Sequence, residues 1–143
     1  MSVEKILADK GRNVVTIGPD GTLAEAARTL HEHRIGAVVV VDGGEAVLGI
    51  ISERDLVNAV AEWGAVALNG PVSARMTRNV ITCGPGAGID EIMGLMTARK
   101  FRHVPIVDGG RLTGIISIGD VVKHRLAEVE AEHAAMRDYI ATA

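Results

Sequence analysis

The chain contains Gly-Ile-Ile-Ser-Glu-Arg-Asp at residues 49–55 and Gly-Ile-Ile-Ser-Ile-Gly-Asp at residues 114–120. The segments ahead of these two motifs also recur, in the same order and with similar residues. The recurring segments are 15–19 with 81–85, 38–44 with 104–110, and, more faintly, the lead-in segments 3–7 with 72–76. The 143 residues are therefore built by an internal duplication.

Each copy is predicted to fold as a β-α-β-β-α unit. A short strand ends in a Gly-Pro turn, and an amphipathic helix follows over about residues 22–34 in the first copy and 88–100 in the second. Thr22 and Glu25 have the spacing of a capping box at the start of the first of these helices. Two β-branched runs joined by Asp-Gly-Gly then predict a hairpin, and a final helix begins within the heptapeptide motif.

One such unit is small for independent stability, because roughly 60 residues bury little apolar surface. The predicted fold is therefore α+β (mixed α/β), with tandem repeats packed sheet to sheet in pseudo-twofold symmetry, plus an extended C-terminal helix. All of residues 1–143 belong to one module in this prediction. Its parts are repeat one at about 3–63, a connector at about 64–71, repeat two at about 72–125 and the C-terminal helix at about 119–140.

The composition disfavours several classes of partner. Hydrophobic residues make up 48% of the chain, but no apolar run approaches the roughly 20 residues of a membrane span, so no membrane partner is expected. The net charge is −3 without a basic block, and Trp63, Phe101 and Tyr139 are the only aromatic residues, so nucleic acid is an unfavourable partner. A single cysteine, Cys83, and a start without a signal-peptide pattern predict a cytoplasmic location.

The two Ser-x-x-Asp pairs are the strongest candidates for binding chemistry. Ser52 with Asp55, and Ser117 with Asp120, stand where a predicted strand meets a predicted helix. The first turn of a helix attracts anions, a hydroxyl there can donate to a phosphate oxygen, and a carboxylate can accept both hydroxyls of a ribose. The alternative is that each pair is only a capping box, with Asp in place of the usual Glu or Gln. The glycine that opens each motif indicates close approach of another backbone or a ligand.

Over about residues 3–125 the chain resembles the paired CBS domains, which are named after cystathionine β-synthase and are also called Bateman modules. The resemblance rests on the Gly-hydrophobic-x-Ser/Thr-x-x-Asp motif in both copies and on the hydrophobic residue followed by proline at 104–105. It implies two clefts between the repeats that bind adenosine-containing ligands such as AMP, ADP, ATP, NAD or S-adenosylmethionine. By matching position it assigns the ribose to Asp55 and Asp120, hydrogen bonds to phosphate to Ser52 and Ser117, and the flanks of the adenine pockets to Thr16 and Thr82.

The two copies differ around these positions. The second has Arg102 and His103 where its first helix turns into a strand, and an arginine can bind a phosphate bidentately. The first has Arg54 inside its motif, which can also serve a phosphate, and Val39 where the family has the proline that the second copy keeps as Pro105. For the arginines the alternative is a solvated helix end. The tighter nucleotide is expected in the cleft of the second copy, which is richer in cations.

No metal site and no catalysis are expected. His103 lacks the neighbouring cluster of Cys, His or carboxylate residues that a metal needs, and His31 and His33 diverge on their helix. Cys83 is expected to be a buried, inert thiol. The chain has no P-loop and no nucleophile paired with a base, so it is predicted not to be an enzyme.

The last predicted helix continues without a breaker to about residue 140, well beyond the length of its counterpart in the first copy. Its apolar positions alternate in steps of four and three residues, which is the pattern of a coiled-coil seam. The resemblance to paired CBS domains, which commonly associate as disc-like dimers, implies that this helix contributes to a homodimer. The alternative is that it folds back along its own domain. A histidine on the seam makes pH sensitivity a further hypothesis. The seam residues are Val122, Leu126, Val129, His133, Met136 and Ile140.

Together these features predict a stand-alone regulatory module. Its adenosine ligand would shift the balance between dimer geometries, and an unidentified protein target would read that change. The alternative, from a different class, is a ligand-free dimeric scaffold whose clefts are empty and whose Ser-x-x-Asp pairs act only as caps.

Overall fold

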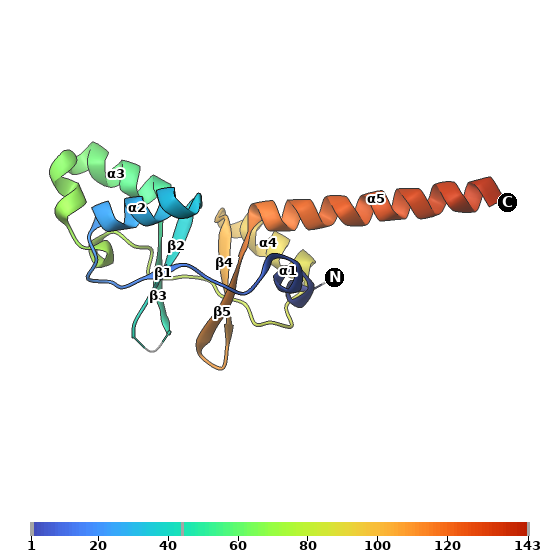
Figure 1. Cartoon of the computed structure of the whole chain (residues 1–143), viewed down its shortest axis with the longest axis horizontal. Coiled ribbons are helices and arrows are strands. Elements are labelled where there is room, and N and C mark those ends of the chain that lie inside the picture. Colours follow the sequence, from blue (N-terminus) through green and yellow to red (C-terminus); the bar gives the residue numbers. More distant parts are fainter. Residues whose placement is uncertain (1, 44, 143) are drawn as a thin grey trace.

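The structure is a computed structural model that describes residues 2–43 and 45–142 of the chain. Two small sheets stand side by side, with helices on their outer sides (Figure 1). In chain order the elements are α1 (Val3–Lys10), β1 (Thr16–Ile17), α2 (Leu23–His33), β2 (Ala37–Val41), β3 (Val47–Ser52), α3 (Glu53–Trp63), the 3-10 helices η1 (Ala65–Asn69) and η2 (Val72–Ala74), α4 (Ile89–Arg99), β4 (His103–Asp108), β5 (Arg111–Ser117) and α5 (Ile118–Thr142). The predicted mixed α+β fold of two repeats with a long final helix is confirmed.

The first sheet has the strand order β1-β2-β3. Strand β1 runs parallel to β2, with Thr16 opposite Val39, and β2 and β3 form an antiparallel hairpin. Helices α2 and α3 cover one face of this sheet. The helix-facing residues of this half form one hydrophobic core, whose buried members are Leu23, Ala26, Leu30, Val38, Val40, Ile51, Ala59, Val72 and Met76.

The second sheet keeps the hairpin, β4 with β5, but its predicted first strand is reduced to one bridge between Cys83 and Ile106. The Cys83 N–H donates to the Pro105 carbonyl at 3.1 Å, and the Cys83 carbonyl accepts from the Val107 N–H at 2.9 Å. A second ladder pair, equivalent to Thr16 with Val39, would need a backbone N–H at Pro105, and proline has none. The strand prediction for residues 81–83 was therefore wrong, because the proline shortens the ladder.

The two halves exchange their lead-in segments. Helix α1 packs into the core of the second half, where Val3, Ile6 and Leu7 are buried with residues of α4, β4, β5 and α5. In return, Val72 and Met76 pack into the core of the first half. Consecutive stretches of sequence therefore do not correspond to the two halves in space, and each half is completed by a segment from the other repeat.

This exchange accounts for the glycine that opens each motif. A Cβ placed on Gly49 would lie 2.6 Å from the carbonyl oxygen of Thr77, and one on Gly114 would lie 2.7 Å from Cδ2 of Leu7. A Cβ at either position would force its neighbour to shift. The glycines therefore allow the exchanged segments to pack closely against β3 and β5, as expected for glycines inside apolar strands.

The faces of the two sheets that point away from their own helices meet each other. Val39 is fully buried, although it alternates away from the helix-facing Val38 and Val40. At the hairpin ends, the Leu112 N–H donates to the carbonyl of Glu45 at 3.2 Å, and Arg111 forms an ion pair with the Glu45 carboxylate at 2.9 Å. The predicted sheet-to-sheet packing is therefore present.

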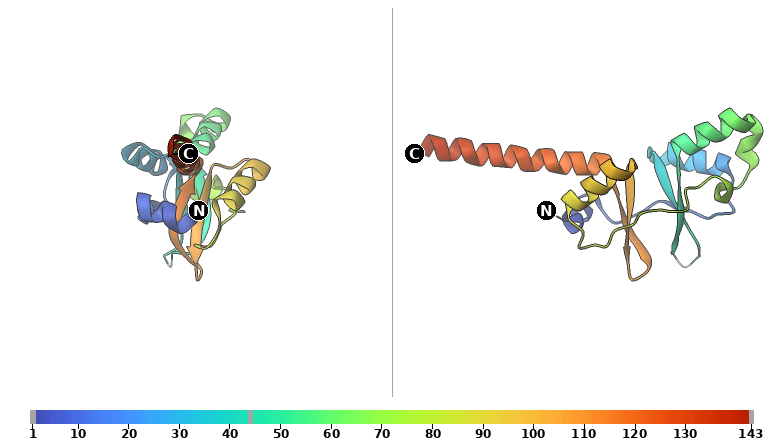
Figure 2. Two further views of the ribbon diagram at one scale, coloured as in Figure 1. Left: turned by 90° about the vertical axis from the view of Figure 1, so that its right-hand side faces the viewer. Right: turned by 180° about the vertical axis from the view of Figure 1, so that it is seen from behind.

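Helix α5 extends far beyond the domain (Figures 1 and 2). It has 25 residues, about 37 Å at 1.5 Å per residue, and Val121 is its only fully buried position among the described residues. Every described residue from 130 onward is exposed. The alternative that this helix folds back along its own domain is therefore wrong. No helix in the described ranges is both long and apolar enough to cross a lipid bilayer.

Candidate ligand-binding site

In the first half, Ser52 ends β3 and caps α3. The Asp55 N–H donates to the Ser52 hydroxyl oxygen at 3.3 Å, and Asp55 Oδ2 accepts from the Ser52 N–H at 2.8 Å and from the Ser52 hydroxyl at 3.0 Å. Three bonds between residues three apart hold both side chains at the start of the helix, where its unpaired N–H groups lie. The pair is therefore a complete capping box.

The second half repeats this geometry at the start of α5. The Asp120 N–H donates to the Ser117 hydroxyl oxygen at 3.1 Å, and Asp120 Oδ2 accepts from the Ser117 N–H at 2.9 Å. One contact has no counterpart in the first half: the ammonium of Lys10, at the end of the exchanged α1, lies 2.6 Å from Asp120 Oδ2. Burial acts to raise the pKa of the Asp120 carboxyl, but hydrogen bonds from Lys10 and Ser117 outweigh it and hold that pKa below its usual value.

The caps engage only one oxygen of each carboxylate. Within the described residues, every hydrogen bond to Asp55 or Asp120 ends on Oδ2. The second oxygen of each carboxylate thus remains available as an acceptor for a ligand hydroxyl. The capping interpretation is confirmed as geometry, and it is compatible with a ligand role for the same side chains.

The strand register places the other predicted site residues on the faces where the two sheets meet. Thr16 lies opposite Val39, and Ser52 lies opposite Ala37, so both share the face that is turned from the helices. In the second half, His103 lies opposite Ser117 and Pro105 alternates away from the core residues Val104 and Ile106. Thr82 precedes Cys83, which packs on the core, and is exposed.

His103 reaches across from the second half to the first. Its Cε1 lies 4.0 Å from the point where a Cβ on Gly36 would stand, and Glu53 Oε1 lies 2.9 Å from the same point. The Gly36 carbonyl in turn accepts from the Glu53 N–H at 3.0 Å. The start of β2, the start of α3 and the start of β4 therefore meet at one end of the sheets.

Burial is the largest influence on His103 and lowers the pKa of its imidazole, and Lys10 lowers that pKa further, while Asp120 opposes both less strongly. The imidazole is half-buried and lies near a lysine, so its positively charged form is disfavoured at this position.

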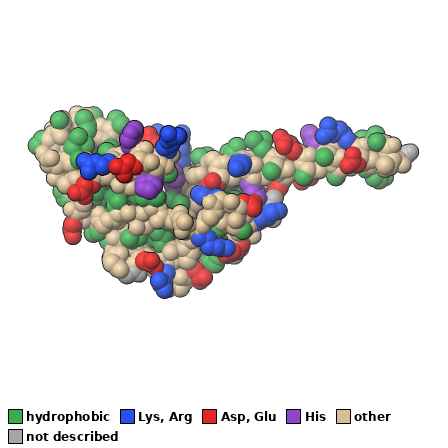
Figure 3. Space-filling view, viewed as in Figure 1, with side chains coloured by type: hydrophobic (Ala, Val, Ile, Leu, Met, Phe, Trp, Pro, Cys, Tyr) green, Lys and Arg blue, Asp and Glu red, His purple; other side chains and the backbone are tan. Residues whose placement is uncertain are grey.

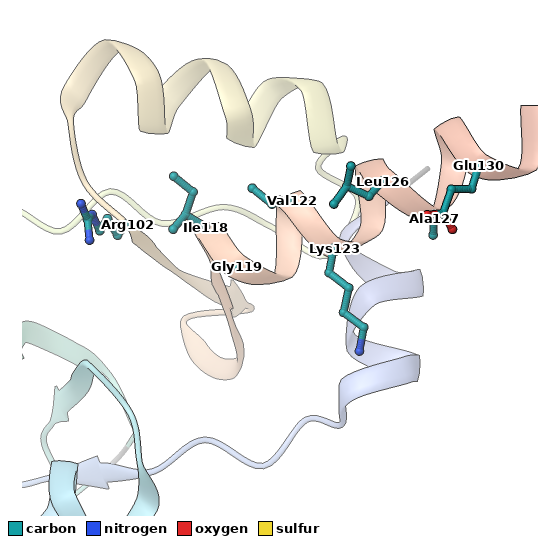
Figure 4. A pocket seen from close by; sticks show the side chains of 8 residues that line it. All are labelled: Arg102, Ile118, Gly119, Val122, Lys123, Leu126, Ala127 and Glu130. Carbon is teal, nitrogen blue, oxygen red and sulfur yellow. The ribbon is translucent and has the colours of Figure 1, made fainter. Parts of the chain in front are cut away.

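The predicted arginines lie at the rim. Arg54 is exposed in the first turn of α3. Arg102 is also exposed, and its carbonyl accepts from the Ile118 N–H at 2.8 Å. Its side chain lines a shallow groove over the outer face of α5 together with Ile118, Val122 and Leu126 (Figure 4). Neither arginine contacts the Ser-x-x-Asp pair of its own half by a hydrogen bond within the described residues.

Lys10 is the site residue that the sequence interpretation missed. The echo between the lead-in segments 3–7 and 72–76 was visible, but it does not say that each segment packs on the other repeat. Lys10 also borders a groove between α1 and α5 that has a volume of about 650 Å³. The lining of this groove mixes charges of both signs, and Asp120, Lys123 and His124 are among its residues.

Cys83 packs against the core of the second half, and burial raises the pKa of its thiol. Cys83 is half-buried rather than buried as predicted, and the raised pKa disfavours the thiolate, which is the reactive form. Among the described residues, no three His, Cys, Asp or Glu side chains are grouped closely enough to hold a metal ion.

Two packed repeats with a capped Ser-x-x-Asp pair at the inner end of each sheet define a class of protein, the paired tandem-repeat domains. Within that class, the chain belongs to the CBS domain family, whose model matches residues 5–62 and 72–127.

Several relatives resemble the chain over most of its length. A crystal structure of a CBS-domain containing protein from Agrobacterium tumefaciens is 56% identical, with a TM-score of 0.84, and the match covers 87% of this chain and 99% of that one. A 17.7 kDa protein of Acidianus ambivalens is 36% identical over 77% of this chain, which spans 66% of that relative's length.

Two similar solved structures carry ligands. The CBS domain protein PAE2072 from Pyrobaculum aerophilum, complexed with AMP, is 28% identical with a TM-score of 0.75 and coverage of 84% of this chain and 89% of that one. The CBS domain pair of protein MJ0100, in complex with 5′-methylthioadenosine and S-adenosyl-L-methionine, is 27% identical with a TM-score of 0.79 and coverage of 90% and 98%.

Proposed function

We propose that this chain is a regulatory module that binds an adenosine-containing ligand between its two repeats. The observation that carries the proposal is the pair of capped carboxylates, Asp55 and Asp120, each with an oxygen that is not used by the cap. Beside each, a helix start presents N–H groups suited to an anion. Thr16 and Thr82 flank the inner faces, where an adenine would lie in this proposal.

The relatives support the ligand class and leave its member open. PAE2072 carries AMP, whereas the MJ0100 domain pair carries 5′-methylthioadenosine and S-adenosyl-L-methionine. AMP, ADP, ATP, NAD and S-adenosylmethionine all present a ribose with two hydroxyls. The proposal therefore treats the carboxylates as ribose acceptors, which is the feature that these ligands share.

Calorimetric titration of these five ligands against the protein tests the proposal. Asp55→Ala and Asp120→Ala should each abolish binding at one site. The matched control is Glu25→Ala, because Glu25 completes the equivalent capping box of α2 with Thr22 and has no proposed ligand contact. Normal binding in both aspartate variants, or failure of the parent protein to bind any of the ligands, would favour a ligand-free scaffold instead.

We further propose that a second copy of the chain covers the exposed seam of α5 and that dimer geometry transmits the ligand signal to a separate protein. Most of the stability of a helix in a protein comes from packing of its apolar face, so the exposed apolar stripe of α5 needs a partner. A heptad seam is complementary to a second copy of itself. Hydrophobic side chains line this helix and also lie over α3 (Figure 3), where Val57 and Trp63 are exposed.

A regulatory rather than an enzymatic role is proposed, because the Ser and Asp side chains of each pair are engaged in a helix cap. The proposal also keeps the reducing cytoplasm as the location, since Cys83 is the only cysteine and has no partner for an intramolecular disulfide.

A further inference from the structure

Lys10 completes the edge of the second sheet in a way that has no parallel in the first. Its ammonium donates to the carbonyl of Ile115 at 2.9 Å and to Asp120 Oδ2 at 2.6 Å. It thereby joins the end of the exchanged α1 to the last strand and to the start of α5. The pair is partly accessible, since the Lys10 side chain is 33% exposed and that of Asp120 is 22% exposed.

The corresponding carbonyl in the first half is satisfied by backbone. Ile50 stands where the second half has Ile115, and its carbonyl accepts from the Thr77 N–H at 2.8 Å. By the alignment of the lead-in segments, Lys10 corresponds to Asn79. No hydrogen bond or ion pair joins Asn79 to Asp55 in the described part of the chain. A lysine side chain in one half therefore replaces a backbone group in the other, and it brings a charge.

An ammonium group has three N–H donors. Ile115 and Asp120 take two of those on Lys10, and no other acceptor within residues 2–43 and 45–142 takes the third. The ammonium is therefore held in place by two fixed acceptors and has one donor left for a ligand. Because the Asp120 capping bond and the Lys10 bond share Oδ2, this donor lies beside the carboxylate whose Oδ1 is unused.

The surroundings of the second motif are also less negative than those of the first. The first motif carries Glu53, Arg54 and Asp55, which leaves it negative. In the second motif Asp120 is the only charged residue, Lys10 neutralises it, and Arg102 lies at the rim. An anionic ligand group is therefore favoured next to Asp120 and disfavoured next to Asp55.

We propose that Lys10 makes the site of the second half selective for adenine nucleotides that carry a phosphate, over uncharged or cationic adenosine derivatives. Its third N–H donates to an anionic phosphate oxygen while Asp120 Oδ1 accepts from the ribose. This inference rests on the proposed function. Beyond the proposed function, it names Lys10 as the residue that determines specificity and a negative charge as the ligand feature that this site selects.

The test is calorimetry on the full chain carrying Asp55→Ala, so that only the second site is observed, with AMP and adenosine as the paired probes. Lys10→Met keeps the length of the side chain and removes its charge. Lys5→Met is the matched control, because Lys5 is an exposed lysine of the same helix. Lys10→Met should weaken AMP binding by roughly tenfold or more, as expected for a lost hydrogen bond between charged groups, and should leave adenosine binding unchanged. Lys5→Met should change neither.

Other outcomes distinguish failure of the inference about Lys10 from failure of the proposed function. Equal losses of affinity for AMP and adenosine in Lys10→Met would show that Lys10 only positions α1. Unchanged AMP binding would show that Lys10 does not reach the phosphate. Either result overturns the inference while the proposed function stands. Binding of neither AMP nor adenosine by the parent protein would overturn the proposed function and this inference together.

Discussion

The two halves of the molecule have the same cap at the start of their last helix but different edges to their sheets. Ser52 with Asp55 and Ser117 with Asp120 share two capping hydrogen bonds of similar length. At the sheet edge, a backbone N–H of Thr77 serves the first half, and the ammonium of Lys10 serves the second. Duplication thus preserved the local geometry of the motif, while the exchanged segments made the surroundings of the two motifs electrostatically different.

A second difference lies in the helices that follow the two motifs. Helix α3 ends after 11 residues at Trp63, whereas α5 runs for 25 residues and leaves the domain. The first half thus returns its chain to the sheet through η1, and the second half presents a long apolar seam. Changes to the helices, the motif residues and the sheet edge would break or sharpen these comparisons.

The largest expected effect concerns the two helices. Ending the chain after Ala127 makes α5 about as long as α3 and removes most of the seam, so we expect the molecular mass in solution to fall from that of a dimer to that of a monomer. Multi-angle light scattering measures this directly. A truncated chain that keeps the mass of a dimer would place the contact elsewhere, with the exposed Val57 and Trp63 on α3 as the next surface to change.

The glycines of the two motifs should differ in their tolerance of a methyl group. Gly49→Ala places a Cβ against a backbone carbonyl, which cannot move easily, and should lower the free energy of unfolding by about 2–3 kcal/mol. Gly114→Ala meets the end of a flexible leucine side chain and should cost only about 1–2 kcal/mol. Urea unfolding of both variants gives the comparison. Equal costs would mean that the exchanged segments are equally able to yield.

The aspartates should differ in stability and in pH dependence. Asp120→Asn weakens a cap and an ion pair and should cost about 1–2 kcal/mol at pH 7, whereas Asp55→Asn weakens only a cap and should cost about 1 kcal/mol or less. Because the folded pKa of Asp120 is lowered, its contribution is present above the unfolded pKa of about 3.9 and is lost as the pH falls through the folded value. Urea unfolding at pH 7 and pH 3 should therefore show that the loss of unfolding free energy caused by Asp120→Asn is smaller at pH 3 than at pH 7.

The smallest expected effect is on His103. Its lowered pKa should appear as an imidazole that titrates below the ordinary value of about 6.5, followed by NMR of the histidine ring protons. Lys10→Met removes a cation that holds the pKa down and should raise it. A His103 titration that does not respond to the loss of Lys10 would show that burial alone sets the value.

Much of the fold could be predicted from sequence patterns that span only a few residues. The predicted helices at about 22–34 and 88–100 appear as Leu23–His33 and Ile89–Arg99, because their apolar stripes and start signals are local. The strand predicted at residues 81–83 failed because the residue that shortens it, Pro105, lies more than 20 positions away. Likewise, the motif residues were found in sequence, but the lowered pKa of His103 depends on the packing around it.

The sequence by itself determined the duplication, the hairpins and the two caps, since each depends on residues that are a few positions apart. Only the tertiary structure decided which lead-in completes which half, and therefore that Lys10 lies on Asp120, a residue 110 positions away. The physical reason is that a local pattern specifies which face of a segment is apolar, but not which of two equivalent cores will bury that face. The chain's connectivity and the close packing against Gly49 and Gly114 decide which core buries each lead-in segment. They thereby also decide which charge lies beside each carboxylate.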